Sequence, residues 1–326
     1  MGGQIPCQRC TPRYCPLNKV TVEHLSDNLN EFRIYYNRII FPELRLLERV
    51  RRGHLALLVA IALASLVVGL WLVTNDNPVL RLLFWLPVYF FLLALRLRTE
   101  RWRRQFKPRI VGLILKFIDP KLRYHANGFI HKEKFLASKL FVTDAETYKC
   151  EDYIAGKVGE IDFEACEIDV RETPRVQGAP THVFHGLFFC AKLRETFQHQ
   201  VLVMPNIEAQ YHLRSIKALT RSGGIRVTVG DEGFDKYFQV FTDSSTDVVN
   251  LLSKRMLAQL LHYRETYHKT PFLSFTDGWM YIGIHYQKDI LEPKLWQSNL
   301  SFDLARSFYE DLHLLTGILR DFDLNN

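Results

Sequence analysis

Three cysteines near the N-terminus have the spacing of metal ligands. Two residues separate Cys7 from Cys10, and Cys15 follows after four more. A Cys-x2-Cys pair with a third cysteine can give three thiolates to a zinc ion. His24 or a partner protein would supply the fourth ligand. The alternative is a metal-free tail, because a closed structural site needs four ligands and no second Cys-x2-Cys pair follows.

Several polar side chains lie near the ends of expected strands and are candidates for acid–base chemistry. Two carboxylates and a histidine do such work only where they converge, and nothing in the spacing of this set brings its members together. We therefore expect satisfied or solvated roles and nominate no catalytic residue, although an enzyme with Asp152, His185 or Asp277 in a cleft stays open. His182 and His185 are three residues apart, which places them on opposite faces of a strand and makes them a poor metal pair. The full set comprises Asp152, His185, Asp277, His285, Asp289 and Glu292.

The other three cysteines, Cys150, Cys166 and Cys190, lie in apolar or strand-like surroundings, and we interpret them as reduced core cysteines. No nucleotide-binding loop, nucleophile elbow, metalloprotease or kinase signature occurs in the chain.

A basic segment at residues 96–109 carries most of the net charge of +7. It flanks an apolar run, where anionic lipid headgroups are the expected partner. Because the charge is not spread over a domain, the distribution argues against a nucleic-acid-binding protein. The candidate headgroup ligands are Arg96, Arg98, Arg101, Arg103, Arg104, Lys107 and Arg109.

Two apolar runs predict a transmembrane hairpin over residues 53–98. The first, 55–73 (LALLVAIALASLVVGLWLV), holds no charge and has the length of a helix that crosses the hydrocarbon core. The second, 79–97, has a shorter uncharged core between Arg81 and Arg96, whose side chains can extend to the two interfaces. A re-entrant or interfacial helix is the alternative for this second run.

The orientation of the hairpin follows from its charges. Both outer flanks are rich in arginine, and the connector 74–78 holds no lysine or arginine. The positive-inside rule therefore predicts a multi-pass protein with both termini in the cytoplasm.

The rest of the chain divides into a tail, two helical segments and one large domain. Residues 1–24 form the cysteine-bearing tail, and 25–52 read as an amphipathic cytoplasmic helix with a stripe of Leu25, Leu29, Phe32, Tyr36 and Ile39. Residues 99–137 read as a basic juxtamembrane helical linker, with an apolar helix at 109–118 that ends at Asp119-Pro120. Residues 138–326 form the cytoplasmic domain.

The cytoplasmic domain shows strands in hairpins and no alternation of strand and helix. We expect a hairpin of 183–191 with 197–204, and a second hairpin of 271–275 with 279–285 around Thr276-Asp277-Gly278. A helix capped near 244–246 and a last helix at 301–322, whose stripe includes Leu304, complete the pattern. The fold class is therefore α+β, an antiparallel sheet with packed helices.

The domain resembles a known family, the bacterial "domain of unknown function 3137" proteins. The resemblance covers roughly residues 25–325, including the hairpin, and leaves out the cysteine-bearing tail. It implies a bacterial inner-membrane protein and implies no activity. The matching stretches are Ser138–Phe141, Glu151–Gly159, His185–Phe189, Tyr281–Ile284, Leu291–Pro293 and Asp323–Asn325.

The function that the sequence favours is a membrane-anchored cytoplasmic binding or scaffold protein, with the bilayer as its first partner. A second copy of the chain or another protein is left open as a further partner. The alternatives are a membrane-tethered enzyme of unrecognised type and a zinc-dependent assembly module built on the N-terminal cysteines.

Overall fold

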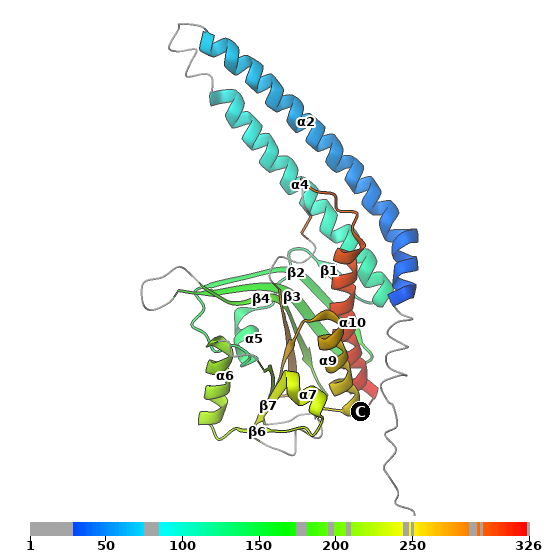
Figure 1. Ribbon diagram of the computed structural model, residues 1–326, viewed down its shortest axis with the longest axis vertical. Helices are drawn as coiled ribbons and strands as arrows, with labels where there is room; N and C mark the ends of the chain where they lie inside the picture. The colour runs from blue at the N-terminus through cyan, green and yellow to red at the C-terminus, as the bar shows by residue number, and fades with distance from the viewer. Residues whose placement is uncertain are drawn as a thin grey trace, which may run out of the picture.

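The protein consists of a stem of two long helices and a domain built on one large sheet (Figure 1). The computed structural model describes residues 29–74, 85–173, 181–194, 199–206, 210–243, 248, 251–286, 292–293 and 296–324. The three N-terminal cysteines and Asp289 lie outside these residues.

The sheet has nine described strands, and every pairing between them is antiparallel. Their order across the sheet is β1-β2-β3-β4-β9-β8-β5-β7-β6. This arrangement confirms the predicted α+β class with an antiparallel sheet. The strands are β1 (Arg123–His125), β2 (Thr147–Val158), β3 (Ile161–Glu172), β4 (Thr181–Lys192), β5 (Val201–Pro205), β6 (Ile225–Val227), β7 (Phe238–Thr242), β8 (Pro271–Thr276) and β9 (Trp279–His285).

Helices cover both faces of the sheet, because its strands are apolar on both sides. One face packs against α4 (Trp85–Ile118), α7 (Glu232–Tyr237), α9 (Lys254–Tyr267) and α10 (Phe302–Leu324) in the larger core cluster. The other face packs against α5 (Lys132–Ala137) and α6 (Gln210–Arg221), whose Phe135 and Leu219 belong to the second cluster. The predicted linker 99–137 thus consists of the second half of α4, β1 and α5.

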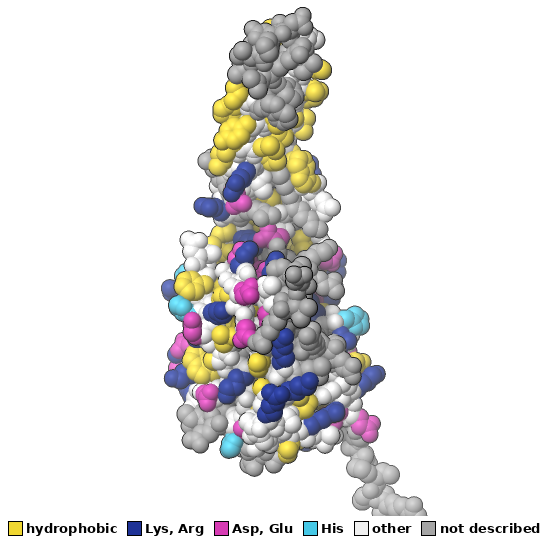
Figure 2. All heavy atoms as spheres, turned by 90° about the vertical axis from the view of Figure 1, so that its left-hand side faces the viewer, with side chains coloured by type: hydrophobic (Ala, Val, Ile, Leu, Met, Phe, Trp, Pro, Cys, Tyr) yellow, Lys and Arg dark blue, Asp and Glu magenta, His cyan; other side chains and the backbone are white. Residues whose placement is uncertain are grey.

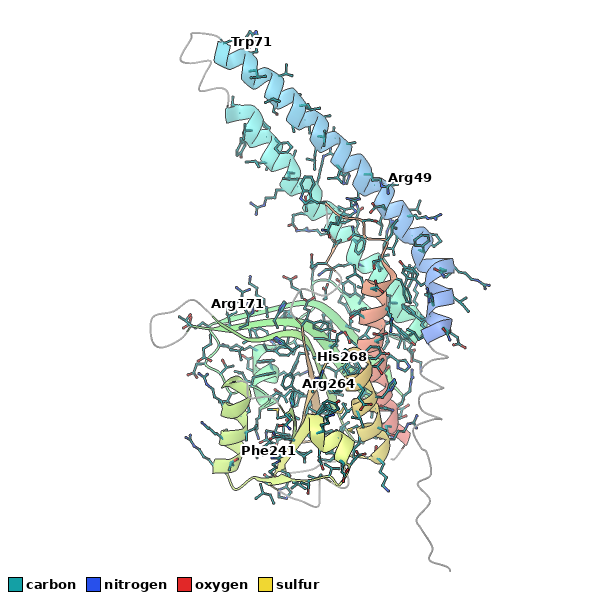
Figure 3. The ribbon with its side chains drawn as sticks, in the orientation of Figure 1. Arg49, Trp71, Arg171, Phe241, Arg264 and His268 are labelled. Carbon is teal, nitrogen blue, oxygen red and sulfur yellow. A yellow bond between two sulfur atoms is a disulfide. The ribbon has the colours of Figure 1, made fainter. Side chains whose placement is uncertain are left out.

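The stem consists of α2 (Phe41–Thr74) and α4, which lie side by side (Figure 1). Both helices continue without a break into the domain, where Leu44 and Leu47 of α2 and Trp102 and Phe106 of α4 join the larger core cluster. The apolar part of α2 is exposed, and Trp71 lies near its far end (Figure 3). Figure 2 shows hydrophobic side chains on the stem and lysine and arginine side chains below them.

One described helical stretch, Leu29–Trp71, is long and apolar enough to cross a membrane, with a mean hydropathy of 2.3 over its best window. This supports a membrane anchor near the N-terminus. Among the described residues α4 does not meet the same criterion, because its apolar part is short and arginines follow it.

The arm before α2 contains a π-helical turn, η1 (Tyr36–Ile40), which shifts the buried stripe by one residue. Phe32 and Tyr36 are buried as expected, but Ile39 is 44% exposed and Ile40 is fully buried in its place. The prediction for Ile39 was therefore wrong, because a strict 3.6-residue period does not hold through a π-turn.

One expectation about strand pairing was wrong. β4 and β5 do not form a hairpin, since β9 and β8 lie between them in the sheet. Val248 and Leu251 are helical, as expected after a cap near 244–246, and the cap itself lies outside the described residues. A further helix, α9, begins at Lys254, where the Ser253 side chain accepts a hydrogen bond from the Met256 backbone N–H.

The turn between β8 and β9 is confirmed. Asp277 and Gly278 both have positive φ angles, 52° and 75°, as a two-residue hairpin turn requires. The apolar helix that ends at Ile118 and the last helix, α10, are confirmed as well. Leu304 is 38% exposed and Ala305 is buried, so the expected stripe of α10 is displaced at its first residue.

Candidate functional site

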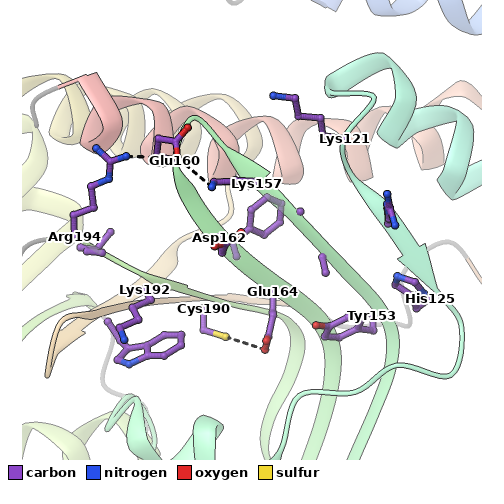
Figure 4. A pocket seen from close by; sticks show the side chains of 16 residues that line it. Lys121, His125, Tyr153, Lys157, Glu160, Asp162, Glu164, Cys190, Lys192 and Arg194 are labelled. Atoms are coloured by element: carbon purple, nitrogen blue, oxygen red, sulfur yellow. Dashed lines mark hydrogen bonds and ion pairs between the residues drawn. The ribbon is translucent and has the colours of Figure 1, made fainter.

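An open groove of about 700 Å³ lies across the ends of β1 to β4, on the face of the sheet that carries Cys190. Figure 4 shows it from close by. Its volume is in the range of small-molecule sites. The residues that line it are Lys121, Arg123, His125, Tyr153, Ala155, Gly156, Lys157, Glu160, Asp162, Phe163, Glu164, Cys190, Lys192, Leu193, Arg194 and Trp279.

Cations stand at the two sides of the groove and carboxylates lie between them. Lys121 and Arg123 come from the segment around β1, and Lys192 and Arg194 come from the end of β4. Asp162 and Glu164 lie on β3, while Glu160 lies in the turn between β2 and β3 (Figure 4). Because β2 and β3 separate β1 from β4, the two basic sides stand on strands about 14 Å apart.

Some of these charges neutralise one another. Glu160 is shared by Lys157 Nζ at 3.1 Å and by an Arg194 guanidinium nitrogen at 3.8 Å. Glu164 pairs with Lys134 Nζ at 2.8 Å, and the Cys190 thiol donates a hydrogen bond to it at 3.8 Å. Burial, followed by the Glu164 charge, raises the pKa of the Cys190 thiol, so this cysteine stays protonated and unreactive at neutral pH.

Three cations of the groove have no such partner. Lys121, Arg123 and Lys192 form no ion pair with any residue that the structure describes. The groove therefore offers unneutralised positive charge on both of its sides.

On the other face of β1 and β2 lies a junction between the domain and the stem, made by Lys107, Tyr124, Asp152 and Glu292. Lys107 Nζ of α4 lies 2.6 Å from an Asp152 oxygen and 2.5 Å from a Glu292 oxygen. The Tyr124 hydroxyl donates a hydrogen bond to the other Asp152 oxygen at 2.5 Å. A β-bulge of β2 places Asp152 there with a φ of 58°.

The charges of the junction reinforce one another. Burial alone would lower the pKa of the Lys107 ammonium, but the charges and hydrogen bonds of Asp152 and Glu292 outweigh burial and raise that pKa. Burial and the Asp152 charge raise the pKa of the Tyr124 hydroxyl. Lys107 is therefore charged and held inside the protein, which separates it from the other candidate headgroup ligands.

The remaining members of the basic segment lie along α4. Arg96, Arg104 and Arg109 are exposed, and Arg98 is half-buried. The side chains of Arg101 and Arg103 lie outside the described part of the structure.

The structure brings two of the candidate acid–base residues, Asp152 and Glu292, together at Lys107. Asp152 is engaged in the junction, His185 Nε2 lies 3.7 Å from Glu167, and Asp277 lies in the turn after β8. β4 pairs with β9 from Gly186 to Lys192, which places Asp277 and His185 near opposite ends of a ladder about 20 Å long. Asp277 and His185 therefore share no acid–base site.

His182 and His185 share a face, contrary to expectation. The register between β3 and β4 shifts between Val170 and Arg171, and the extra residue on β4 turns both histidine rings to one side, with centroids 5.7 Å apart. His182 Nδ1 contacts Asp169 at 2.9 Å. Within the described residues, no group of three or more side chains is arranged to hold a metal ion.

Cys150 and Cys166 form a disulfide between β2 and β3, beside the bulge that carries Asp152. This corrects their interpretation as reduced core cysteines. Cys190 is buried and free, as expected.

Sequence reasoning missed the groove, because its walls come from segments around residues 121–125, 153–164, 190–194 and 279. The sequence did contain one indication of the junction. Asp152 and Glu292 lie in two of the stretches that carry the family resemblance, and Lys107 joins these stretches in space.

Comparison with known proteins supports the family and little more. Residues 182–324 match the family model described as "Protein of unknown function (DUF3137)", which confirms the resemblance over that part of the chain. No curated protein sequence matches the chain. The crystal structure of the mycobacterial trehalose monomycolate transport factor A, TtfA, is similar with a TM-score of 0.32 and 8% identity, covering 59% of this chain and 88% of that chain. At this TM-score the likeness carries no inference.

Proposed function

We propose that this chain, a DUF3137 family protein over residues 182–324, is a membrane-anchored binding protein whose sheet domain is held at a fixed position beside the bilayer. The observation that carries the proposal is the continuity of the stem. α2 and α4 each pass as one helix from exposed apolar residues into the core of the domain. A domain attached in this way cannot swing freely, which suits a protein that presents a binding surface.

The anchor is the apolar part of α2. Its residues 55–73 would span about 28 Å, close to the thickness of the hydrocarbon core. Leu63, Leu66 and Val67 are 58–66% exposed, so the domain does not cover this face and lipid is its natural neighbour.

The first part of α4 would accompany α2 as a second crossing. It lies beside α2 (Figure 1), and Leu86, Tyr89, Phe90, Leu92 and Leu97 are exposed on it.

The headgroup contacts would come from the upper part of the basic segment. The polar layer of a bilayer is about 6 Å thick on each side. Arg109 lies 13 residues beyond Arg96, about 20 Å along the helix axis, which exceeds both this layer and the Debye length in physiological salt. We therefore assign headgroup binding to Arg96 and Arg98, each contributing about 1 kcal/mol.

The arginine-rich flanks favour a cytoplasmic domain. The disulfide between Cys150 and Cys166 is the opposing observation, because disulfides are rare in reducing compartments. Protease treatment of inverted and right-side-out membrane vesicles decides the orientation. Degradation of the domain in inverted vesicles alone supports the cytoplasmic assignment, and degradation in right-side-out vesicles alone reverses it.

Two matched leucines test the anchor. Leu66→Arg would place a charge near the bilayer centre at a cost of about 2.5–3.5 kcal/mol. Leu46→Arg changes a leucine of the same helix that is also exposed but lies beside the domain. After carbonate extraction and flotation, we expect the Leu66 variant to leave the membrane fraction and the Leu46 variant to remain. Equal retention of both would contradict a crossing at this position.

Headgroup binding has its own control in the same helix. Replacing Arg96 and Arg98 with glutamine should weaken association with anionic vesicles about tenfold or more, whereas Arg109→Gln should leave it within about twofold. An equal loss from Arg109→Gln would overturn the assignment.

The zinc-dependent assembly module stays a prediction, since Cys7, Cys10 and Cys15 lie outside the described residues. Metal analysis of the purified protein, compared with the triple Cys→Ser variant, tests it. Equal zinc content in the two proteins would rule it out.

A further inference from the structure

We infer that the groove between β1 and β4 binds a small soluble molecule that carries anionic groups at both ends and hydroxyl groups between them, as sugar bisphosphates do. The inference rests on the proposed binding role and names a ligand class for it.

The unneutralised cations select for anionic groups. After the pairs of Glu160 and Glu164 are taken into account, Lys121, Arg123 and Lys192 remain without an ion pair among the described residues. These three side chains line an open groove of about 700 Å³, so a ligand can reach them from solvent. Lysine and arginine side chains in this situation bind phosphate or carboxylate groups through charge-assisted hydrogen bonds.

The spacing of the cations favours two anionic groups rather than one. Lys121 stands on the β1 side and Lys192 on the β4 side (Figure 4). Arg123 is the first residue of β1 and lines the groove as well. The strands that carry them are about 14 Å apart, and the side chains shorten that span. A single phosphate can contact one side, while a molecule with two separated phosphates can contact both.

The floor of the groove favours hydroxyl donors in the middle of the ligand. Asp162 and Glu164 of β3 lie between the two basic sides. Carboxylates accept hydrogen bonds and repel a third anionic group, so the central part of the ligand should be uncharged and should donate hydrogen bonds.

The position of the groove favours a soluble ligand over a headgroup of the same bilayer. β1 and β2, which carry one side of the groove, meet α4 at Lys107. Lys107 lies 11 residues beyond the headgroup contact at Arg96, about 16 Å along the helix axis. The groove therefore lies well beyond the polar layer of the membrane.

The test is calorimetric titration of the detergent-solubilised full-length protein with fructose 1,6-bisphosphate as the probe. We expect a dissociation constant below about 1 mM. Inorganic phosphate should bind at least about tenfold more weakly, because it loses the contacts on one side. No heat of binding with the bisphosphate up to about 10 mM overturns the proposal.

Variants locate the binding. Lys121→Gln with Lys192→Gln removes one exposed cation from each side and should weaken binding of the bisphosphate about a hundredfold. Lys217→Gln, an exposed lysine of α6 outside the groove, is the matched control and should bind as the unchanged protein does. Equal affinity of all three proteins would place the ligand elsewhere and overturn the inference.

Two further measurements distinguish a soluble bisphosphate from a single phosphate and from a lipid headgroup. Equal affinity for inorganic phosphate and the bisphosphate would overturn the two-sided arrangement. Competition of the bisphosphate by anionic lipid vesicles, lost in the Lys121 and Lys192 variant, would assign the groove to headgroups and overturn the soluble source. Because the titration uses protein in detergent, its outcome does not depend on the flotation experiment that tests the anchor.

Discussion

Removal of the Lys107 ammonium is the most direct test of how the stem and the domain are joined. The change is Lys107→Met, which keeps the length of the side chain and deletes its charge. Asp152 and Glu292 would then lose the ammonium that both contact, and their side chains are only 15% and 22% exposed. Removing one partner of a buried ion pair typically costs about 3–5 kcal/mol. Because all three groups keep some contact with water, we expect the lower end, about 3 kcal/mol.

This cost should be visible as a drop in melting temperature. For a domain of 150–250 residues, 1 kcal/mol corresponds to about 2–4 °C, so the variant should melt about 6–12 °C lower. The measurement is thermal unfolding of the full-length protein in detergent, followed by tryptophan fluorescence. Limited proteolysis at a fixed temperature should cleave the variant faster, because the contact between α4 and the sheet is weakened.

Matched variants make the result specific. Arg109→Met removes an exposed cation two residues farther along the same helix and should shift the melting temperature by less than about 2 °C. Adding Asp152→Asn and Glu292→Gln to Lys107→Met removes the two carboxylate charges that Lys107 had contacted and should recover part of the loss. A Lys107→Met protein that melts with the unchanged protein and resists protease equally would refute the junction as a stabilising contact.

Three further perturbations have defined outcomes. Gly159→Ala should lower the free energy of unfolding by about 2 kcal/mol, because a Cβ would lie 1.7 Å from an Asp323 oxygen and the backbone has a φ of +59°. Gly223 has a φ of +98° and open space around it, so Gly223→Ala measures the backbone effect alone and should cost about half as much. His313 has its pKa lowered to about 4 by burial and by a nearby arginine, so its neutral form is favoured in the folded state; stability present above pH 6.5 should fall by about 3 kcal/mol as the pH drops to 4, and His313→Gln should flatten this dependence. Reduction of the disulfide between Cys150 and Cys166, which lie 16 residues apart, should lower the free energy of unfolding by up to about 3 kcal/mol. The Cys150→Ser protein should melt at the same temperature with and without reductant.

The sequence was most informative where structure depends on neighbouring residues. The Asp277-Gly278 turn follows from the backbone conformations that these residues tolerate, and the end of α4 before Pro120 follows from the restriction that proline places on the preceding residue. The long apolar helix was visible from composition alone.

Errors arose where distant pairing or one inserted residue decides the outcome. The hairpin expected for β4 and β5 fails because β9 is a better partner for β4, a choice that local pattern does not encode. The faces of His182 and Ile39 were both assigned from a regular period, and a β-bulge and a π-turn each break that period.

The groove could not have been found from the sequence. Its cations become neighbours only through the order of β1 to β4, and single lysines and arginines at these positions look like ordinary surface charge.

Because α2 is one continuous helix, a change in its tilt would move the domain. The 34 residues of α2 form one rod about 51 Å long, which is seated in the domain at one end. With the proposed anchor, the other end of the rod would lie in the apolar layer of the bilayer. A change of about 10° in the tilt of that rod, such as a thinner bilayer imposes, would displace its domain end sideways by about 9 Å. Bilayer thickness would then set how far the domain stands from the axis of its anchor.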